Sequence, residues 1–270
     1  MTSKQPSWEY SLAEAIKLIG SDGFKDALIQ ALERLADFDY SVIFVYRGDR
    51  KPVDLHDTFS VKRRSIYVGQ YQEGPYLLDP FFQACRDNAA TGLYRLKDLA
   101  PDRFYQSEYY RSYYKKTELA EEIGFVVALP NQAYVVISLM RIESKSAFSQ
   151  REMKLLRLVE PVISALSERH WRNVHGELFT TATDGVPLPI LLKAQVESAF
   201  HSFGTSLLTP RELEVVGLVL RGHSSDSVAQ HLSIATGTVK TYRRNIYAKL
   251  GICSQAELFS MFLASCQKQP

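Results

Sequence analysis

The segment 236–251 (TGTVKTYRRNIYAKLG) predicts a helix whose polar face carries only basic charge. Val239, Ile246 and Leu250 have the helical spacing that lets them face a small core. No acidic residue lies between positions 236 and 250, and the other face projects Thr241 and four cations: Lys240, Arg243, Arg244 and Lys249. Such side chains neutralise phosphates and reach base edges in the major groove. This helix therefore has the chemistry of nucleic-acid recognition.

A basic helix face taken alone is more often a solvated surface, so the neighbouring elements must decide between the two interpretations. Thr209 is placed as the N-cap of an earlier helix, with Pro210 at its first position and Glu212 completing a capping box. Gly222 suits the left-handed residue that closes such a helix. This pattern predicts a well-bounded helix of about three turns.

Two further short helices are predicted on either side of the basic one. The first covers 224–234 and is followed by a tight turn at 233–235. The second starts after Ser254, which forms a capping box with Glu257. Four short helices in fewer than 65 residues, with a tight turn before the basic helix, predict a helix-turn-helix unit.

The register of these residues closely resembles the DNA-binding domain of the LuxR family. The matching positions are L-T-P-R-E-x-E-V at 208–215, Gly222, V-A at 228–229, L-x-I at 232–234, T-V-K at 238–240 and I-x-x-K-L-G at 246–251. The match extends from 208 to about 263, roughly a fifth of the chain. The resemblance favours recognition of double-stranded DNA over a merely solvated basic helix.

The resemblance also implies roles for individual residues. Three side chains would face base edges: Lys240, Thr241 and Arg244. Three would lie near phosphates: Thr209, Thr238 and Arg243. Lys249, the last cation of the helix, is a further candidate DNA contact, and the fourth helix would help to form a homodimer. A regulator of this kind could also contact RNA polymerase.

Two positions depart from the family pattern. Ala235 stands where the family has a Ser or Thr cap for the recognition helix, and Tyr242 replaces a His. A missing cap costs about 1 kcal/mol unless Thr236 takes over by starting the helix one residue later. The same four-helix unit also resembles the promoter-reading region of sigma factors. That alternative would require another helical DNA- and polymerase-binding region upstream, where an α+β pattern is predicted instead.

A second constellation lies in the N-terminal half, at Tyr67, Tyr71 and Asp79-Pro80. It resembles the W-x3-Y-x8-D-P pattern of the quorum-sensing branch of the LuxR family, with Tyr for Trp and one residue deleted. In that branch the three side chains bind an acyl-homoserine lactone. The resemblance implies a ligand site at Tyr67, Tyr71 and Asp79 for a small amphipathic effector, whether an acyl-homoserine lactone or another molecule.

The same residues have a structural interpretation. Asp79-Pro80 can cap a helix, and tyrosines four residues apart can be ordinary core aromatics. The tyrosine-rich stretch 104–114 suits an apolar pocket with polar anchors, a helix-packing surface or a dimer face. If the structural interpretation holds, the N-terminal domain is a dimerisation or protein-interaction module that needs no effector.

The elements that would position these residues form an α+β pattern. The expected elements are helices at 8–19 and 24–38, strands at 41–46 and 53–59, short helices and loops over 62–122, strands at 125–130 and 134–142, and a long helix from 149 toward 171. This order is similar to GAF/PAS-like sensor folds, with an antiparallel sheet flanked by helices. We expect a sensor domain at 1–172, a breaker-rich linker with a short helix at 173–206 and an all-α reader at 207–270.

Composition agrees with this division. The 270 residues carry a net charge of only +2, yet residues 207–270 hold seven cations against four acids. The three cysteines lack metal-ligand spacing. None of the common catalytic, phosphate-binding or dinucleotide-binding motifs occurs, so we expect no enzyme, metal site or cofactor. The sequence shows neither a signal peptide nor a long apolar run, which predicts a cytoplasmic protein with no membrane contact.

Overall fold

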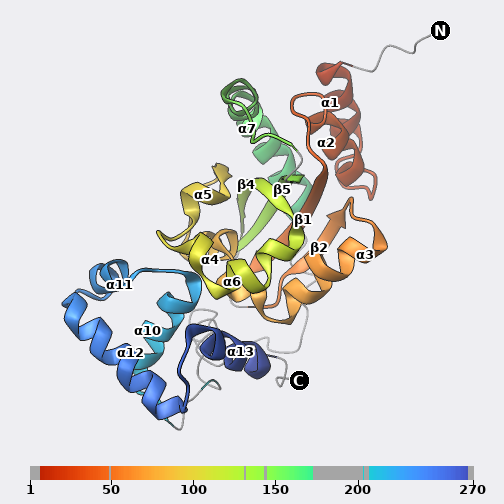
Figure 1. Ribbon diagram of the computed structural model, residues 1–270. Coiled ribbons are helices and arrows are strands. Elements are labelled where there is room, and N and C mark those ends of the chain that lie inside the picture. The colour runs from red at the N-terminus through yellow and green to blue at the C-terminus, as the bar shows by residue number, and fades with distance from the viewer. Residues whose placement is uncertain are drawn as a thin grey trace, which may run out of the picture.

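The computed structural model describes residues 7–48, 50–130, 132–142, 145–172, 203 and 207–266. Within these ranges the N-terminal part contains a five-stranded antiparallel sheet in the order β2-β1-β5-β4-β3 (Figure 1). The strands are β1 (Tyr40–Arg47), β2 (Val53–Asp57), β3 (Gly92–Arg95), β4 (Leu119–Leu129) and β5 (Ala133–Ile142). The predicted α+β fold with an antiparallel sheet is thereby confirmed.

Both faces of this sheet are buried, which explains the nearly continuous apolar strands. Successive side chains point to opposite faces of a strand. In β1, Ile43 and Val45 enter one core, whereas Phe44 and Tyr46 enter the other. The sheet is therefore the middle layer of a helix–sheet–helix sandwich.

Three helices belong to the first face. They are α1 (Trp8–Lys17), α2 (Phe24–Leu32) and α7 (Gln150–Trp171). Helices α2 and α7 contribute core residues directly, and α1 packs against α2 (Figure 1). The α7 helix begins at the predicted capping box, in which Ser149 and Glu152 bond to each other's backbone amides.

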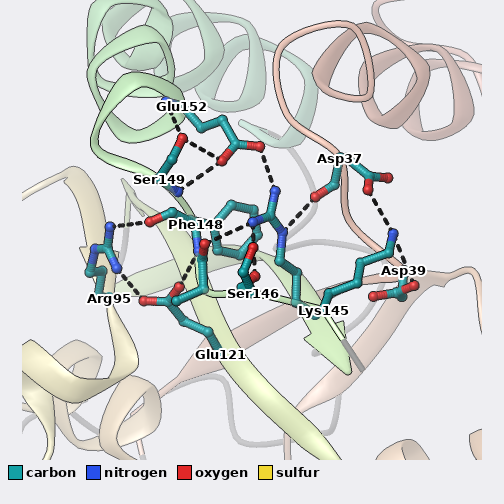
Figure 2. A network of polar contacts seen from close by, with 11 residues as sticks. Asp37, Asp39, Arg95, Glu121, Lys145, Ser146, Phe148, Ser149 and Glu152 are labelled. Carbon is teal, nitrogen blue, oxygen red and sulfur yellow. Dashed lines mark hydrogen bonds and ion pairs between the residues drawn. The ribbon is translucent and has the colours of Figure 1, made fainter. Parts of the chain in front are cut away.

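A buried polar network fastens the start of α7 to the sheet, as Figure 2 shows. Arg95 of β3 pairs with Glu121 of β4 and donates to the Phe148 carbonyl at 2.8 Å. Arg141 of β5 pairs with Glu152 and lies over the Phe148 ring, 4.1 Å from its centroid. Because every charge in this network has a partner, we assign it a structural role.

The second face is covered by short elements, as predicted for 62–122. The α-helices there are α3 (Val61–Arg64), α4 (Pro80–Arg86), α5 (Leu96–Leu99) and α6 (Glu108–Ser112). Between them lie a π-helical turn, Ser65–Gln70, and 3-10 turns at Tyr71–Glu73, Pro75–Leu78, Phe104–Gln106 and Tyr114–Thr117. Strand β3 and the first residues of β4 lie inside the predicted helical region, and the sequence did not predict them.

The C-terminal part has the predicted helix-turn-helix arrangement. Its helices are α10 (Pro210–Arg221), α11 (Ser225–Leu232), α12 (Thr236–Leu250) and α13 (Gln255–Cys266). Thr209 and Glu212 form the expected capping box, and Gly222 closes α10 with a φ of 101°. Ser233, with a φ of 53°, makes the tight turn before α12. The predicted linker and short helix at 173–206 lie outside the described residues except for Phe203, which is buried near Phe262.

The two parts are in contact within the described residues. The loop before α6 meets the turn between α10 and α11, where Arg103 N–H donates to the Gly222 carbonyl at 3.0 Å and Ser224 N–H donates to the Asp102 carboxylate at 2.9 Å. Helix α13 lies against α6 and against Gly74 (Figure 1). Helix α13, which the sequence resemblance assigned to dimerisation, thus also contacts the N-terminal part of its own chain, and its role in dimerisation remains a prediction.

Candidate nucleic-acid interface and ligand cavity

The predicted base-reading side chains share the exposed face of α12. Val239 and Ile246 are buried in the core, which fixes the orientation of the helix. Lys240, Thr241 and Arg244 are exposed. The arrangement agrees with the predicted division of faces, and a basic helix face that is exposed among the described residues can enter a major groove.

The predicted phosphate contacts fall into two environments. Thr238 is exposed at the first turn of α12. Arg243 is half-buried, and its guanidinium donates to the Tyr247 hydroxyl at 3.5 Å. Both can approach a backbone phosphate from the side of the helix.

Thr209 and Lys249 are held together by a third residue, Glu212. The Glu212 carboxylate accepts from the Thr209 hydroxyl at 2.9 Å and from Lys249 Nζ at 2.7 Å. Burial opposes ionisation of Glu212, but the bonds from Lys249 and Thr209 outweigh it and lower the pKa of Glu212. Both predicted DNA contacts therefore have intramolecular partners, and the sequence reasoning missed this link between α10 and α12.

The start of α12 settles which residue is its cap. The helix begins at Thr236 with Ala235 in the cap position and no side-chain cap bond. The Thr236 hydroxyl instead donates to Asp226 of α11 at 2.8 Å. The possibility that Thr236 shifts the helix start by one residue is therefore wrong, because this hydroxyl is used between the two helices.

The predicted ligand residues gather around one cavity, between the sheet and the short helices of its second face. Tyr67, Tyr71 and Asp79 all line it, together with residues from β1, β4 and β5. Its volume is about 30 Å³. That is room for about one or two water molecules, so its own side chains nearly fill it.

Asp79 caps α4 and also lines the cavity. Its Oδ1 accepts from the amides of Phe81 and Phe82 at 2.7 and 3.1 Å, which caps α4. Its Oδ2 accepts from the Tyr109 hydroxyl at 3.3 Å. Burial raises the pKa of Asp79 above the ordinary range, and the amide bonds only partly offset that rise.

The two predicted tyrosines are buried core residues as well as lining residues. The Tyr71 hydroxyl bonds to the Tyr46 hydroxyl at 2.9 Å. The Tyr67 hydroxyl donates to the Thr117 carbonyl, and burial raises the pKa of Tyr67 to about 12. Tyr109, Tyr113 and Tyr114 of the tyrosine-rich stretch also line the cavity. The same rings therefore pack the core and form the cavity wall.

Glu122 is a lining residue that the sequence reasoning missed. It lies on β4, is 6% exposed and accepts from the Tyr114 hydroxyl at 3.2 Å. Burial, and next the nearby Asp79, raise the pKa of Glu122. The adjacent acids at 121 and 122 could have indicated this buried carboxyl. Neighbouring side chains of a strand point to opposite faces, so in a sheet buried on both faces each of the two carboxyls faces a core.

The fold and the site together define a two-part regulator. One part is a helix-turn-helix reader, and the other is an α+β domain with a small cavity lined by carboxyl and tyrosine side chains. The model of the family "Bacterial regulatory proteins, luxR family" matches residues 206–262. A helix-turn-helix-type transcriptional regulator from the exeN 3' region of Aeromonas salmonicida is 32% identical over 185 residues, covering 68% of this chain and 93% of that protein. The chain therefore belongs to the LuxR family and is a DNA-binding transcriptional regulator with a sensor-type domain.

Two further proteins are similar to this chain: a solved domain and a much longer regulator. The crystal structure of the VqsR LBD domain from Pseudomonas aeruginosa is 26% identical with a TM-score of 0.54, covering 63% of this chain and 98% of that one. The transcriptional regulator MalT from Serratia proteamaculans is 27% identical over 202 residues, 73% of this chain but only 21% of MalT. The chain thus spans about a fifth of the length of MalT. The helices in the described ranges are all too short or too polar to cross a bilayer.

Proposed function

We propose that residues 207–270 read a promoter site in the cytoplasm under the control of a non-catalytic sensor domain at 1–172, joined to the reader by a linker at 173–206. The protein acts as a homodimer on a pseudo-palindrome. Its half-sites lie about one helical turn, roughly 34 Å, apart.

The observation that carries this proposal is the free basic face of α12. Among the described residues, neither Lys240 nor Arg244 forms an ion pair. Both are exposed beside Thr241. In our proposal these three residues read base edges, Thr238 and Arg243 bind phosphates, and Thr209 and Lys249 act at the edge of the interface.

The test starts with selection of the preferred site from random DNA, followed by Arg244→Ala. Loss of one bidentate base contact should cost about 1–3 kcal/mol on that site and much less on scrambled DNA at the same salt concentration. Arg151→Ala, at an exposed position of α7, is the matched control. An Arg244→Ala protein that keeps its full preference for the selected site would refute the base-reading role.

For the sensor, we infer that a small amphipathic molecule occupies the cavity lined by Tyr67, Tyr71 and Asp79. Support comes from the similarity to a ligand-binding domain and from the position of the cavity relative to the reader. The Tyr109 ring, bonded to Asp79, lies 5.8 Å from the ring of Phe104. Phe104 in turn contacts Gly222 of the reader. A ligand that moves Tyr109 can therefore displace the reader.

The small volume of the cavity favours a second candidate function, a regulator that needs no effector. Thermal melting against a broad metabolite library separates the two. A ligand at 100 times its dissociation constant adds about 2.7 kcal/mol to the stability of its target. Native mass spectrometry of gently purified protein shows whether a ligand is already bound. Intact DNA binding, with neither a stabilising compound nor a bound molecule, would favour the second candidate.

A further inference from the structure

Two carboxyl groups lie in the lining of the cavity of the sensor domain. Asp79 and Glu122 are each only 6% exposed. Among the described residues that line the cavity, the others are apolar or carry hydroxyl groups, and none is Lys, Arg or His. The charge of this cavity is therefore of one sign whenever either carboxyl ionises.

The two carboxyls have hydrogen-bond donors but no positive partner among the described lining residues. Asp79 Oδ1 accepts from the Phe81 and Phe82 amides, whereas Oδ2 has only a long bond, 3.3 Å, from Tyr109. Glu122 is bonded by Tyr114 and Ser138. A buried charge is costly unless it is paired with an opposite charge. The described lining therefore lacks positive charge.

The rest of the lining favours an organic cation as the source of that charge. The rings of Tyr71 and Tyr113 pack against each other with centroids 6.4 Å apart, and those of Tyr109 and Tyr113 with centroids 5.6 Å apart. The negative faces of aromatic rings attract organic cations. The cavity therefore combines buried carboxyls with tyrosine rings.

We propose that the effector is an organic cation, whose primary or secondary ammonium group lies between Asp79 and Glu122 and whose apolar body packs against the tyrosine rings. This inference rests on the proposed sensing function, since it assigns a ligand class to the same cavity. Burial favours the protonated form of the Glu122 carboxyl, so in this proposal Glu122 releases its proton to the buffer when the ammonium binds. The two carboxylates then share the single positive charge.

Entry of such a ligand requires the tyrosine rings to move, because the closed cavity holds only about 30 Å³. The covering segments are tied by bonds that can open. Tyr67 donates to the Thr117 carbonyl, and Tyr113 donates to the Ile66 carbonyl at 3.1 Å. Outside them, Arg63 pairs with Glu118 at 3.2 Å. Opening these contacts frees two hydroxyl groups and makes room beside both carboxyls.

Three probes built on six-carbon chains test the inference: hexylammonium, N-hexylacetamide and hexanoate, measured by titration calorimetry on the full chain at pH 7. We expect hexylammonium to bind at least 10-fold more tightly than N-hexylacetamide and hexanoate not to bind. Repeating the titration in buffers of different ionisation enthalpy should show release of up to one proton with hexylammonium alone.

Variants separate the carboxyl chemistry from general packing. Glu122→Gln should weaken hexylammonium binding at least 10-fold and abolish proton release while leaving N-hexylacetamide binding unchanged. Asp79→Asn removes the second charge but preserves the cap of α4, because Asn is as good an N-cap as Asp. It should therefore fold and also weaken hexylammonium binding at least 10-fold. Glu168→Gln, on the outer helix α7, is the matched control and should change nothing.

The outcomes distinguish this inference from the proposed function. If N-hexylacetamide or hexanoate binds as tightly as hexylammonium, the cavity senses small molecules but does not select cations, and only the inference fails. If none of the three probes binds at concentrations up to millimolar, the inference is also overturned. The sensing function itself then stands or falls with the metabolite screen and with native mass spectrometry.

Discussion

At the scale of single residues, the raised pKa of Glu122 has a measurable effect on stability. Its native pKa lies above that of the unfolded chain, so the native state binds more protons than the unfolded state from about pH 4.5 upward. Unfolding free energy is therefore lost as the pH rises through the native pKa. Urea denaturation of wild type and Glu122→Gln between pH 5 and 8 should show the variant gaining relative to wild type with rising pH, by at most about 1.4 kcal/mol per pH unit.

The control for this pH prediction is Glu168→Gln in α7, which removes a half-exposed carboxylate that pairs with Arg172 at 3.2 Å outside the cavity. Its stability difference from wild type should stay nearly constant over the same pH range. A constant difference between wild type and Glu122→Gln from pH 5 to 8 would mean that Glu122 has no raised pKa in the native state.

Residue types in the sequence predicted the chemistry of the site better than its geometry. Lys240 and Arg244 are exposed as expected because the apolar spacing of α12 fixes its faces. The sequence could not predict that Lys249 reaches Glu212, since the two are 37 positions apart and meet only when α10 packs on α12. It also offered two alternatives for Asp79: the structure confirms the helix cap through Oδ1, and the ligand contact stays a prediction.

At the scale of elements, the Gly222 turn joins the reader to the sensor. Its φ of 101° strains any other residue, and a Cβ there would lie 2.9 Å from the Phe104 Cα. Gly222→Ala should therefore cost more than the roughly 1 kcal/mol of left-handed strain alone. Gly251→Ala, at the end of α12, isolates that strain because its φ is 66° and a Cβ meets nothing within 4 Å.

Urea denaturation and hydrogen exchange of residues 101–107 check this prediction. We expect Gly222→Ala to be the less stable of the two variants and to exchange faster in that loop, with Gly251→Ala unchanged there. Equal destabilisation of the two variants would show that the close approach to Phe104 is absent in solution.

Long elements with caps were predictable from the sequence, and short ones were not. The caps at Ser149 and Thr209 place the starts of α7 and α10 as the structure has them. Strand β3 has only four residues, Gly92–Arg95, and exists because it pairs with β4. A segment this short has no periodicity of its own, so only its tertiary partner defines it as a strand.

At the scale of the whole molecule, the sequence predicted two parts but not their contact. The sequence predicted a linker between the two parts and gave no sign of a direct contact, whereas Asp102 and Arg103 of the sensor bond to Ser224 and Gly222 of the reader. The contact lies one layer of side chains from the cavity, because Phe104 separates the two. Ligand chemistry and DNA reading can thus be coupled without the recognition face itself being covered, since Lys240 and Arg244 stay exposed.

Asp102→Ala tests whether this contact couples the two parts. Burial opposes ionisation of Asp102, but the bonds from the Ser224 side chain and amide outweigh it and lower the pKa of Asp102. Removing this partly exposed carboxylate should cost no more than about 1 kcal/mol and should speed exchange of the Ser224 amide. It should also weaken the effect of bound ligand on DNA affinity, while DNA affinity without ligand changes little.

Asp98→Ala, in α5, serves as the control. If ligand alters DNA affinity equally in wild type and Asp102→Ala, the coupling runs through another route, and the contact serves only to hold the two parts together.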